Sequence, residues 1–196
     1  MIAVVDYRAG NLTSVKKALE HLGAEAIVTG DPRVVATADK IILPGVGHFS
    51  ATAVLQETGL RTAILQRIER AVPFLGVCVG MQWMFESSEE APGMSGLGLF
   101  SGRCERFPER VKSPHVGWNS LVCREGSRLF QGIGDGSFVY FTHSYRAPVV
   151  DATVARSEYG GAFSAAVERA HIFGVQFHPE KSGAVGLKLL ENFCAL

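Results

Sequence analysis

Short apolar runs alternate with helical patterns over the first 85 residues, and this alternation constrains the fold more than any other feature of the chain. The apolar runs that predict buried strands cover residues 2–6, 26–28, 40–43 and 73–77. Spacings of three, four and three, typical of one face of a helix, join Leu12, Val15, Leu19 and Leu22. Helical spacing returns at residues 49–55, 60–72 and 81–85. Such an alternation predicts a parallel sheet with helices on both faces.

The pattern changes after Glu86. Residues 87–97 are rich in Ser, Glu, Gly and Pro, which predicts a loop. Close spacing favours antiparallel pairing of the later predicted strands, at residues 102–107, 116–123, 137–145, 153–158, 162–168 and 171–177. Residues 183–195 predict a closing helix. Because no linker or repeat interrupts the chain, we expect one α/β domain over residues 1–196, with a mostly parallel central sheet and an antiparallel extension.

Charge and cysteine content exclude several classes of function. The 19 Lys and Arg residues balance 19 Asp and Glu residues, and a neutral chain is a poor match for nucleic acid or an anionic membrane. No apolar run approaches the ~18 residues of a membrane-spanning helix, and the first residues do not form a signal peptide. The four cysteines form no C-x-x-C pair, so we expect no metal site and no redox dithiol. The sequence therefore predicts a cytoplasmic protein with reduced thiols.

A cysteine stands where the fourth predicted strand turns into a helix, in the segment Gly76-Val77-Cys78-Val79-Gly80. A nucleophile projects from such a tight turn, and Gly76 and Gly80 avoid clashes there. The start of the following helix favours a thiolate, and the amide of Val79 points toward a developing oxyanion. The alternative is a buried cysteine with no chemical role. The flanking glycines favour the nucleophile.

His178, Pro179 and Glu180 follow the last predicted strand and offer the base that a nucleophilic cysteine needs. His178 and Glu180 are two residues apart, so in extended geometry they point the same way. Pro179 restricts the residue before it to extended conformations. By itself such a pair is more often a surface His beside a solvated Glu. Joined to Cys78, it predicts a Cys–His–Glu triad.

Residues 44–47, with the sequence Pro-Gly-Val-Gly, end the third predicted strand. The carboxyl ends of parallel strands gather at one edge, where ligands bind, so this backbone can present amides to an oxyanion. Phosphate or dinucleotide binding is the rival interpretation. Gly45 and Gly47 are followed by Ser50 in place of the third glycine of that fingerprint, so we expect no nucleotide cofactor.

Together these segments resemble the class I (triad-type) glutamine amidotransferases. The family motif G-x-C-x-G-x-Q is met by Gly76, Cys78, Gly80 and Gln82, and the motif H-P-E by residues 178–180. Within that family, the chain is similar to the glutaminase subunits of imidazole glycerol phosphate synthases at residues 6–12, 44–47, 114–119, 140–145 and 178–182. The resemblance covers the whole chain and implies the flavodoxin-like fold of these amidotransferases.

The resemblance implies hydrolysis of L-glutamine to glutamate and ammonia without metal or cofactor. Cys78 would form a glutamyl thioester, His178 would transfer protons, and Glu180 would orient His178. The backbone of residues 45–47 would supply a second oxyanion donor beside the Val79 amide. The residues expected to hold the substrate are Gln82, Gly47, Val79, His143, Ser144 and Tyr145.

By the same resemblance, the ammonia passes to a (β/α)₈-barrel synthase subunit in a heterodimer. That subunit makes imidazole glycerol phosphate and AICAR from PRFAR in histidine biosynthesis. The candidates for the docking face are Trp118, Asn119, Tyr140 and Lys181, since Trp and Tyr are favoured at interface hot spots. Trp118 is equally compatible with a core position. Such subunits have almost no activity without their partner. We therefore expect that, in the chain alone, the backbone N–H donor of residues 44–47 points away from the oxyanion position.

Two alternatives stay open. A paralogous amidotransferase subunit would use the same catalytic residues but supply ammonia to a different synthase, and capture of the partner separates the two. A redox-sensing or chaperone-like α/β protein also carries a cysteine on a strand elbow. That class does not need His178, Glu180 and Gln82 together, and alkylation by a glutamine-analogue electrophile tests it.

Overall fold

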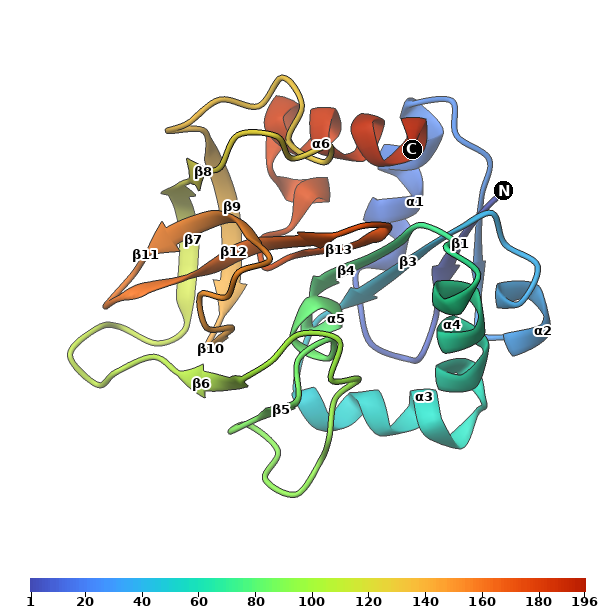
Figure 1. Ribbon diagram of the computed structural model, residues 1–196, viewed down its shortest axis with the longest axis horizontal. Helices are drawn as coiled ribbons and strands as arrows, with labels where there is room; N and C mark the ends of the chain where they lie inside the picture. The colour runs from blue at the N-terminus through green and yellow to red at the C-terminus, as the bar shows by residue number, and fades with distance from the viewer.

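The computed structural model describes all 196 residues and confirms the predicted α/β fold (Figure 1). Its main sheet has eight strands in the order β2-β1-β3-β4-β13-β12-β11-β8. Five of them run parallel: β2 (Ala26–Thr29), β1 (Ile2–Val5), β3 (Lys40–Gly45), β4 (Phe74–Cys78) and β13 (Ile172–Val175). The antiparallel extension adds β12 (Ala162–Arg169), β11 (Thr153–Glu158) and β8 (Val122–Cys123). The parallel half has the strand order of a flavodoxin-like fold.

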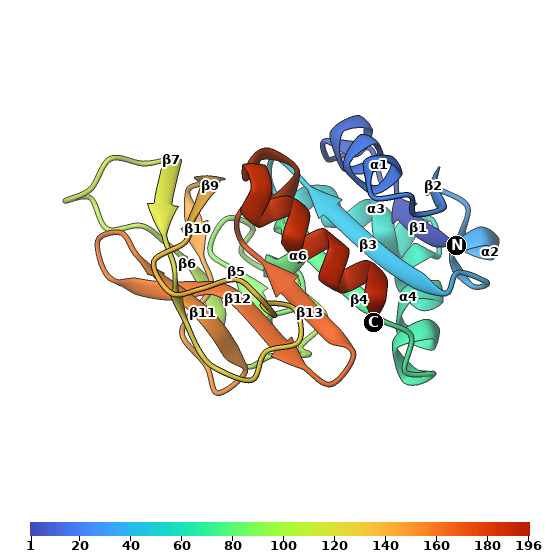
Figure 2. The same cartoon turned by 90° about the horizontal axis from the view of Figure 1, so that it is seen from above.

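Helices cover both faces of the parallel strands. Figure 2 shows α6 (Gly183–Ala195) lying across one face with α1 (Leu12–His21). The opposite face is covered by α2 (Pro32–Val35), α3 (Ala53–Glu57) and α4 (Leu60–Glu69). A 3₁₀ turn, η1 (Phe49–Thr52), precedes α3. None of the helices is both long and apolar enough to cross a membrane.

Alternate residues of each central strand enter two separate cores. Val4 and Ile42 pack with α1 and α6, whereas Ala3, Val5 and Ile41 pack with α3 and α4. Every residue of β1 and β4 is buried, as expected for strands covered on both faces. Two cores on opposite sides hold the carboxyl ends of β3, β4 and β13 rigidly at one edge.

Two predicted strands are wrong in their extent, because each run divides between different sheets. Residues 116–123 form β7 (His115–Ser120) and β8, which are separated by Leu121. The side chain of Leu121 is buried in the core, and its N–H donates to the Ser137 carbonyl over 2.9 Å. Residues 137–145 form β9 (Phe138–His143) and β10 (Tyr145–Arg146). Between these two strands the Ser144 carbonyl accepts from the N–H of Phe107 over 3.1 Å.

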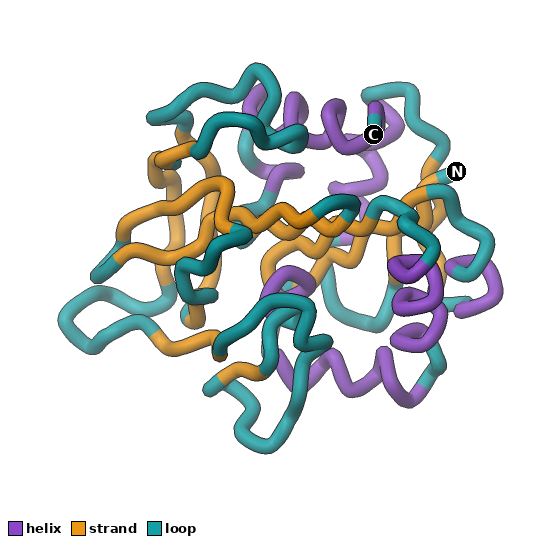
Figure 3. The backbone as a smooth tube through the Cα atoms, viewed as in Figure 1, coloured by secondary structure: helices purple, strands orange, loops and turns teal.

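Pairing also departs from the prediction. β13 is antiparallel to β12 but parallel to β4, because local spacing does not reveal the partner on the far side of a strand. The predicted loop at residues 87–97 contains β5 (Ser87–Ser88), which is parallel to β6 (Arg103–Arg106) in a small sheet with β10. β7 and β9 form a separate antiparallel ribbon. Figure 3 shows these short strands and long connections gathered on one side of the molecule, away from α2 and α4.

Candidate active site

Cys78 lies on a backbone turn that residues with a side chain rarely adopt. It ends β4 with φ 56° and ψ −110°, and α5 (Val79–Gln82) begins at the next residue. A methyl group on Gly76 would come within 2.6 Å of the Gly80 carbonyl oxygen, and one on Gly80 would collide with the Leu43 carbonyl oxygen. Both glycines are therefore required by the close packing of the turn against itself and against β3.

His178 and Glu180 form the expected pair, but by a different local geometry. His178 is extended, with φ −98° and ψ 99°, while residues Pro179–Lys181 form the 3₁₀ turn η2. The prediction of extended geometry through Glu180 is therefore wrong, since the turn folds the carboxylate back onto the ring. His178 Nδ1 donates to Glu180 Oε1 over 3.0 Å, with the two side chains 2% and 1% exposed.

The environment of His178 favours its charged form. Burial by itself lowers the pKa of His178, but the neighbouring sulfur of Cys78 and the carboxylate of Glu180 outweigh burial and raise the pKa to about 10. The Nε2 atom, on the ring edge opposite Nδ1, is buried without a hydrogen-bond partner. The imidazole therefore lies between a carboxylate and the sulfur, with Nε2 as the atom that can exchange a proton with Cys78.

Two further groups contact the sulfur of Cys78. Its Sγ donates toward the Thr142 carbonyl of β9 over 3.8 Å, and the Nε2 of Gln176 donates to Sγ over 3.6 Å. Gln176 is fully buried just beyond β13 and was missed in the sequence. The available signal was its place two residues before His178, which puts the two side chains on the same side of an extended chain.

Gln82, expected to bind the substrate, already uses both protons of its amide nitrogen. Its Nε2 donates to the Tyr145 carbonyl over 2.9 Å and to Gln176 Oε1 over 3.1 Å. An amide nitrogen carries only two protons, so only Oε1 of Gln82 remains for a ligand. Its side chain is 2% exposed, at the carboxyl end of α5.

The segment from His143 to Tyr145 lies beside the sulfur but has little free hydrogen-bonding capacity. The Tyr145 carbonyl accepts from Gln82 and also from His143 Nδ1, over 2.8 Å. The ring of His143 is buried, and its Nε2 contacts His115 Nδ1 over 3.1 Å. Ser144 is half-buried, and its hydroxyl is not engaged in any hydrogen bond. Of this segment, the hydroxyl groups of Ser144 and of the half-buried Tyr145 are left for a small molecule.

The proposed oxyanion segment is next to Cys78 through the sheet itself. β3 continues two residues beyond the predicted end, and Gly45 pairs with Cys78. Gly47 follows in an exposed turn with φ 113°. Val79 is the first residue of α5, so its N–H has no carbonyl of the preceding turn to bond. Two backbone segments thus border the sulfur.

The four docking candidates lie together on the β7–β9 ribbon and η2. Trp118 is 55% exposed, which excludes the core position, and its ring meets Tyr140 edge-on at 6.1 Å. Lys181 Nζ lies 5.8 Å from the centre of the Tyr140 ring. Asn119 is half-buried and donates to the Glu158 carbonyl over 2.9 Å. Val116 and Phe138 extend this apolar face, at 56% and 57% exposure, and nothing in the sequence indicated Phe138.

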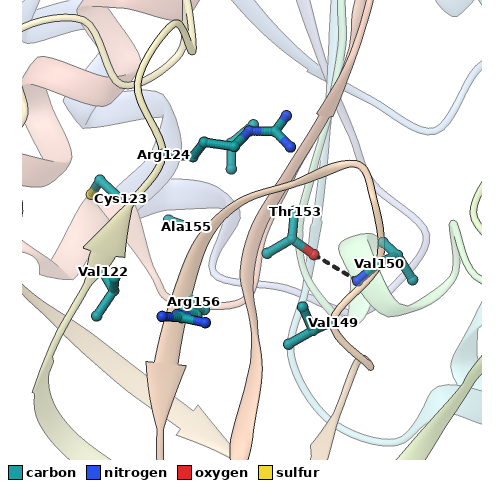
Figure 4. A pocket seen from close by; sticks show the side chains of 9 residues that line it. Val122, Cys123, Arg124, Val149, Val150, Thr153, Ala155 and Arg156 are labelled. Atoms are coloured by element: carbon teal, nitrogen blue, oxygen red, sulfur yellow. Dashed lines mark hydrogen bonds between the residues drawn. The ribbon is translucent and has the colours of Figure 1, made fainter.

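A separate pocket opens at the far, antiparallel edge of the main sheet (Figure 4). It has a volume of about 310 Å³ and lies between β8, the start of β11 and residues 149–150. Arg124, Arg156 and Cys123 line it, and none of the predicted site residues does. No group of three His, Cys, Asp or Glu side chains in the chain could hold a metal ion. Cys104, Cys123 and Cys194 are free thiols, and burial raises the pKa of each.

Comparisons with known proteins agree with this geometry. A sequence model of the family "Glutamine amidotransferase class-I" matches residues 3–195. The chain is 49% identical over 195 residues to the imidazole glycerol phosphate synthase subunit HisH of Methanothermobacter thermautotrophicus, covering 98% of this chain and 97% of that one. It is 45% identical to the HisH subunit of Methanocaldococcus jannaschii, with 100% of both chains covered.

Similar proteins also occur among bacteria and among solved structures. The HisH subunit of Bacillus cereus is 46% identical, covering 98% of this chain and 93% of its own. A crystal structure of a glutamine amidotransferase superposes with a TM-score of 0.78 at 19% identity, covering both chains completely. A chain in the structure of PurLQS from Thermotoga maritima superposes with a TM-score of 0.73 at 21% identity, covering 98% of this chain and 96% of its own.

Proposed function

This chain belongs to the class I glutamine amidotransferase family, and we propose that it is the glutaminase subunit of an imidazole glycerol phosphate synthase in histidine biosynthesis. In that role it hydrolyses L-glutamine to glutamate and ammonia. The observation that carries the proposal is the buried line from Glu180 through His178 to Cys78 on the strand–helix turn. Full-length similarity to HisH subunits of archaea and bacteria supports the choice of synthase.

Cys78 would act as the nucleophile. Its thiolate attacks the side-chain amide carbon of glutamine, and the resulting oxyanion is stabilised by the Val79 N–H and by the backbone after Gly45. Loss of one such donor typically costs ~10²–10³ in rate. His178 Nε2 gives its proton to the departing nitrogen, which leaves as ammonia and yields the glutamyl thioester.

His178 would then act as a base in the second half of the reaction. It removes a proton from water, which attacks the thioester, and glutamate leaves as the sulfur regains its negative charge. Glu180 keeps the proton on Nδ1 of the ring, so Nε2 faces the sulfur and the water. The net reaction consumes one water and releases one glutamate and one ammonia.

A second subunit would consume the ammonia. We place its docking surface on the exposed apolar face of β7 and β9, around Trp118 and Tyr140, one strand from the triad. Its expected partner is a (β/α)₈-barrel synthase that converts PRFAR into imidazole glycerol phosphate and AICAR. Charge neutrality of the chain fits docking through a local aromatic face rather than through long-range attraction.

The proposal is tested by measuring ammonia release from glutamine with and without a barrel synthase subunit and PRFAR. We expect release that increases on addition of both, and that is abolished in Cys78→Ala. A glutamine-analogue electrophile, 6-diazo-5-oxo-L-norleucine, should label the parent chain and not Cys78→Ala. Labelling that persists in Cys78→Ala refutes the nucleophile, and stimulation only by a different synthase favours a paralogous amidotransferase.

A further inference from the structure

Gln176 is the one buried side chain that donates a hydrogen bond to the sulfur of Cys78. It follows β13 directly and is fully buried, with its N–H bonded to the Ala165 carbonyl over 2.8 Å. The side-chain Nε2 lies 3.6 Å from Sγ, within range for a hydrogen bond to sulfur. Buried amide groups are almost always hydrogen-bonded, so the contact restricts both partners.

One backbone carbonyl determines which end of the Gln176 amide faces the sulfur. The Tyr145 carbonyl can only accept, so the atom of Gln82 beside it must be the nitrogen. That nitrogen also contacts Gln176, at 3.1 Å, so the Gln176 atom there must be the oxygen. The other end of the Gln176 amide is then the nitrogen, and a donor faces Sγ. The orientation therefore follows from the network rather than from an arbitrary choice of amide flip.

The same carbonyl also fixes the proton positions of two buried histidines. His143 Nδ1 must donate to the Tyr145 carbonyl, which leaves His143 Nε2 to accept from His115 Nδ1. This arrangement needs both rings neutral. Burial lowers the pKa of His115 to about 4 and that of His143 to about 3, so each ring carries one proton at neutral pH.

The network ends near the protein surface. Asn119 Nδ2 lies 3.5 Å from His115 Nε2 and donates to the Glu158 carbonyl over 2.9 Å. The ring of His115 stacks on Tyr159, with centres 4.0 Å apart, and on Phe141. Aromatic packing and hydrogen bonds together leave the inner members little freedom to rotate.

The two neighbours of the sulfur favour opposite protonation states. The Thr142 carbonyl accepts from an S–H group and so favours the thiol. The Gln176 N–H is complementary to a negative sulfur and so favours the thiolate, which is the nucleophilic form. His178 beside the sulfur also favours the thiolate. Removal of the Gln176 donor would leave His178 alone to oppose the Thr142 carbonyl.

We propose that Gln176 holds the sulfur of Cys78 as a thiolate aimed at the substrate, and that Gln82 and the Tyr145 carbonyl lock Gln176 in that orientation. This inference deepens the proposed glutaminase function and rests on it for its effect on turnover. Its effect on the reactivity of Cys78 does not depend on glutamine, so the two can be tested separately.

The test compares Gln176→Met and Gln176→Glu with the parent chain. Met keeps the length of the side chain but has no donor, whereas Glu replaces the donor with a carboxylate. Gln66→Glu is the matched control, because Gln66 is exposed on α4. The rate of iodoacetamide alkylation at the Cys78 peptide is followed by mass spectrometry from pH 5 to 10, and circular dichroism confirms folding.

We expect the pH midpoint of Cys78 alkylation to rise by about one unit in Gln176→Met, equivalent to about tenfold less thiolate at neutral pH, and by more in Gln176→Glu. In the assembled synthase, kcat should fall about tenfold, with KM changed less than about threefold. Gln66→Glu should leave the pH midpoint of alkylation, kcat and KM unchanged. A folded Gln176→Met chain with an unchanged midpoint refutes the proposal, because a merely structural glutamine would not move it.

A measurement on the parent chain removes any dependence on how the variants fold. With ¹⁵N in the glutamine side chains, the Gln176 amide signal should titrate over the same pH range as Cys78 alkylation and shift on alkylation. If no glutamine side-chain signal changes with the ionisation or alkylation of Cys78, the proposed donor role of Gln176 is wrong. Failure of the glutaminase proposal would look different, since the parent chain would then release no ammonia even with its synthase partner and PRFAR, while the rate of Cys78 alkylation still depended on pH.

Discussion

Gly76→Ala tests whether the strand–helix turn at Cys78 determines the geometry of the triad. The new methyl group would lie 2.6 Å from the Gly80 carbonyl oxygen and 2.7 Å from Met84 Sδ. Real Cβ atoms essentially never come within 3.0 Å of such atoms, so the turn must open by at least about 0.4 Å. Overpacking of this kind costs about 1–3 kcal/mol, which corresponds to a Tm lower by about 3–10 °C in a chain of this size.

The same displacement should also lower reactivity. A shift of about 1 Å in a reacting group can cost ~10²-fold, so an opening of nearly half that size predicts about tenfold slower labelling by 6-diazo-5-oxo-L-norleucine. Gly134→Ala is the matched control, because a methyl group there meets nothing within 4 Å. Thermal unfolding and labelling are measured on all three chains. A Gly76→Ala chain that unfolds within about 1 °C of the control and is labelled at the parent rate refutes the reasoning.

Three further predictions follow from the site and its surroundings. Glu180→Gln removes a buried charge 3.0 Å from His178 Nδ1, and kcat for ammonia release should fall by about 10–10²-fold; unchanged turnover would contradict the orienting role. Lowering the pH from 6 to 5 should reduce the free energy of urea unfolding by about 2 kcal/mol, because His115 and His143 take up protons in the unfolded chain but stay neutral in the folded one. The stability that comes from the raised pKa of His178 is nearly complete below pH 6.5, so it changes little over this range. A free energy of unfolding that does not change between pH 6 and pH 5 would exclude neutral His115 and His143 rings. Trp118→Ala should weaken binding of the synthase subunit by about tenfold or more in calorimetry, with the Tm of the chain alone unchanged.

Local features of the fold were predictable because they depend on neighbouring residues. The turn at Cys78 was recognisable from Gly76 and Gly80, since the close approaches that exclude a side chain lie within a few residues of the nucleophile or on the adjacent strand. The last helix begins and ends at the predicted residues, 183 and 195. The pairing of His178 with Glu180 was also expected, although through the wrong backbone conformation.

Features that depend on distant parts of the chain were not predictable in the same way. The run at residues 137–145 has continuous strand propensity, and only tertiary contact with Phe107 shows that Ser144 separates two sheets. The family resemblance implies that Gln82 contacts the substrate, and that role stays a prediction for its Oε1 atom. What the sequence could not show is that both of its amide protons are taken by Tyr145 and Gln176, which lie 63 and 94 residues further along the chain.

β9 connects the proposed docking face to the triad within a single strand. Tyr140 packs against Trp118 on the exposed side, and its carbonyl accepts the His178 N–H over 2.9 Å while its own N–H donates to Ser182 over 3.0 Å. Two residues further on, the Thr142 carbonyl contacts the sulfur. A partner that moves β9 by a fraction of an ångström therefore moves both the backbone of the base and the group that favours the thiol. Activation by a docked synthase subunit would then need no long path through the fold, because the six-residue strand β9 carries both Tyr140 of the proposed docking face and the Thr142 carbonyl beside the sulfur.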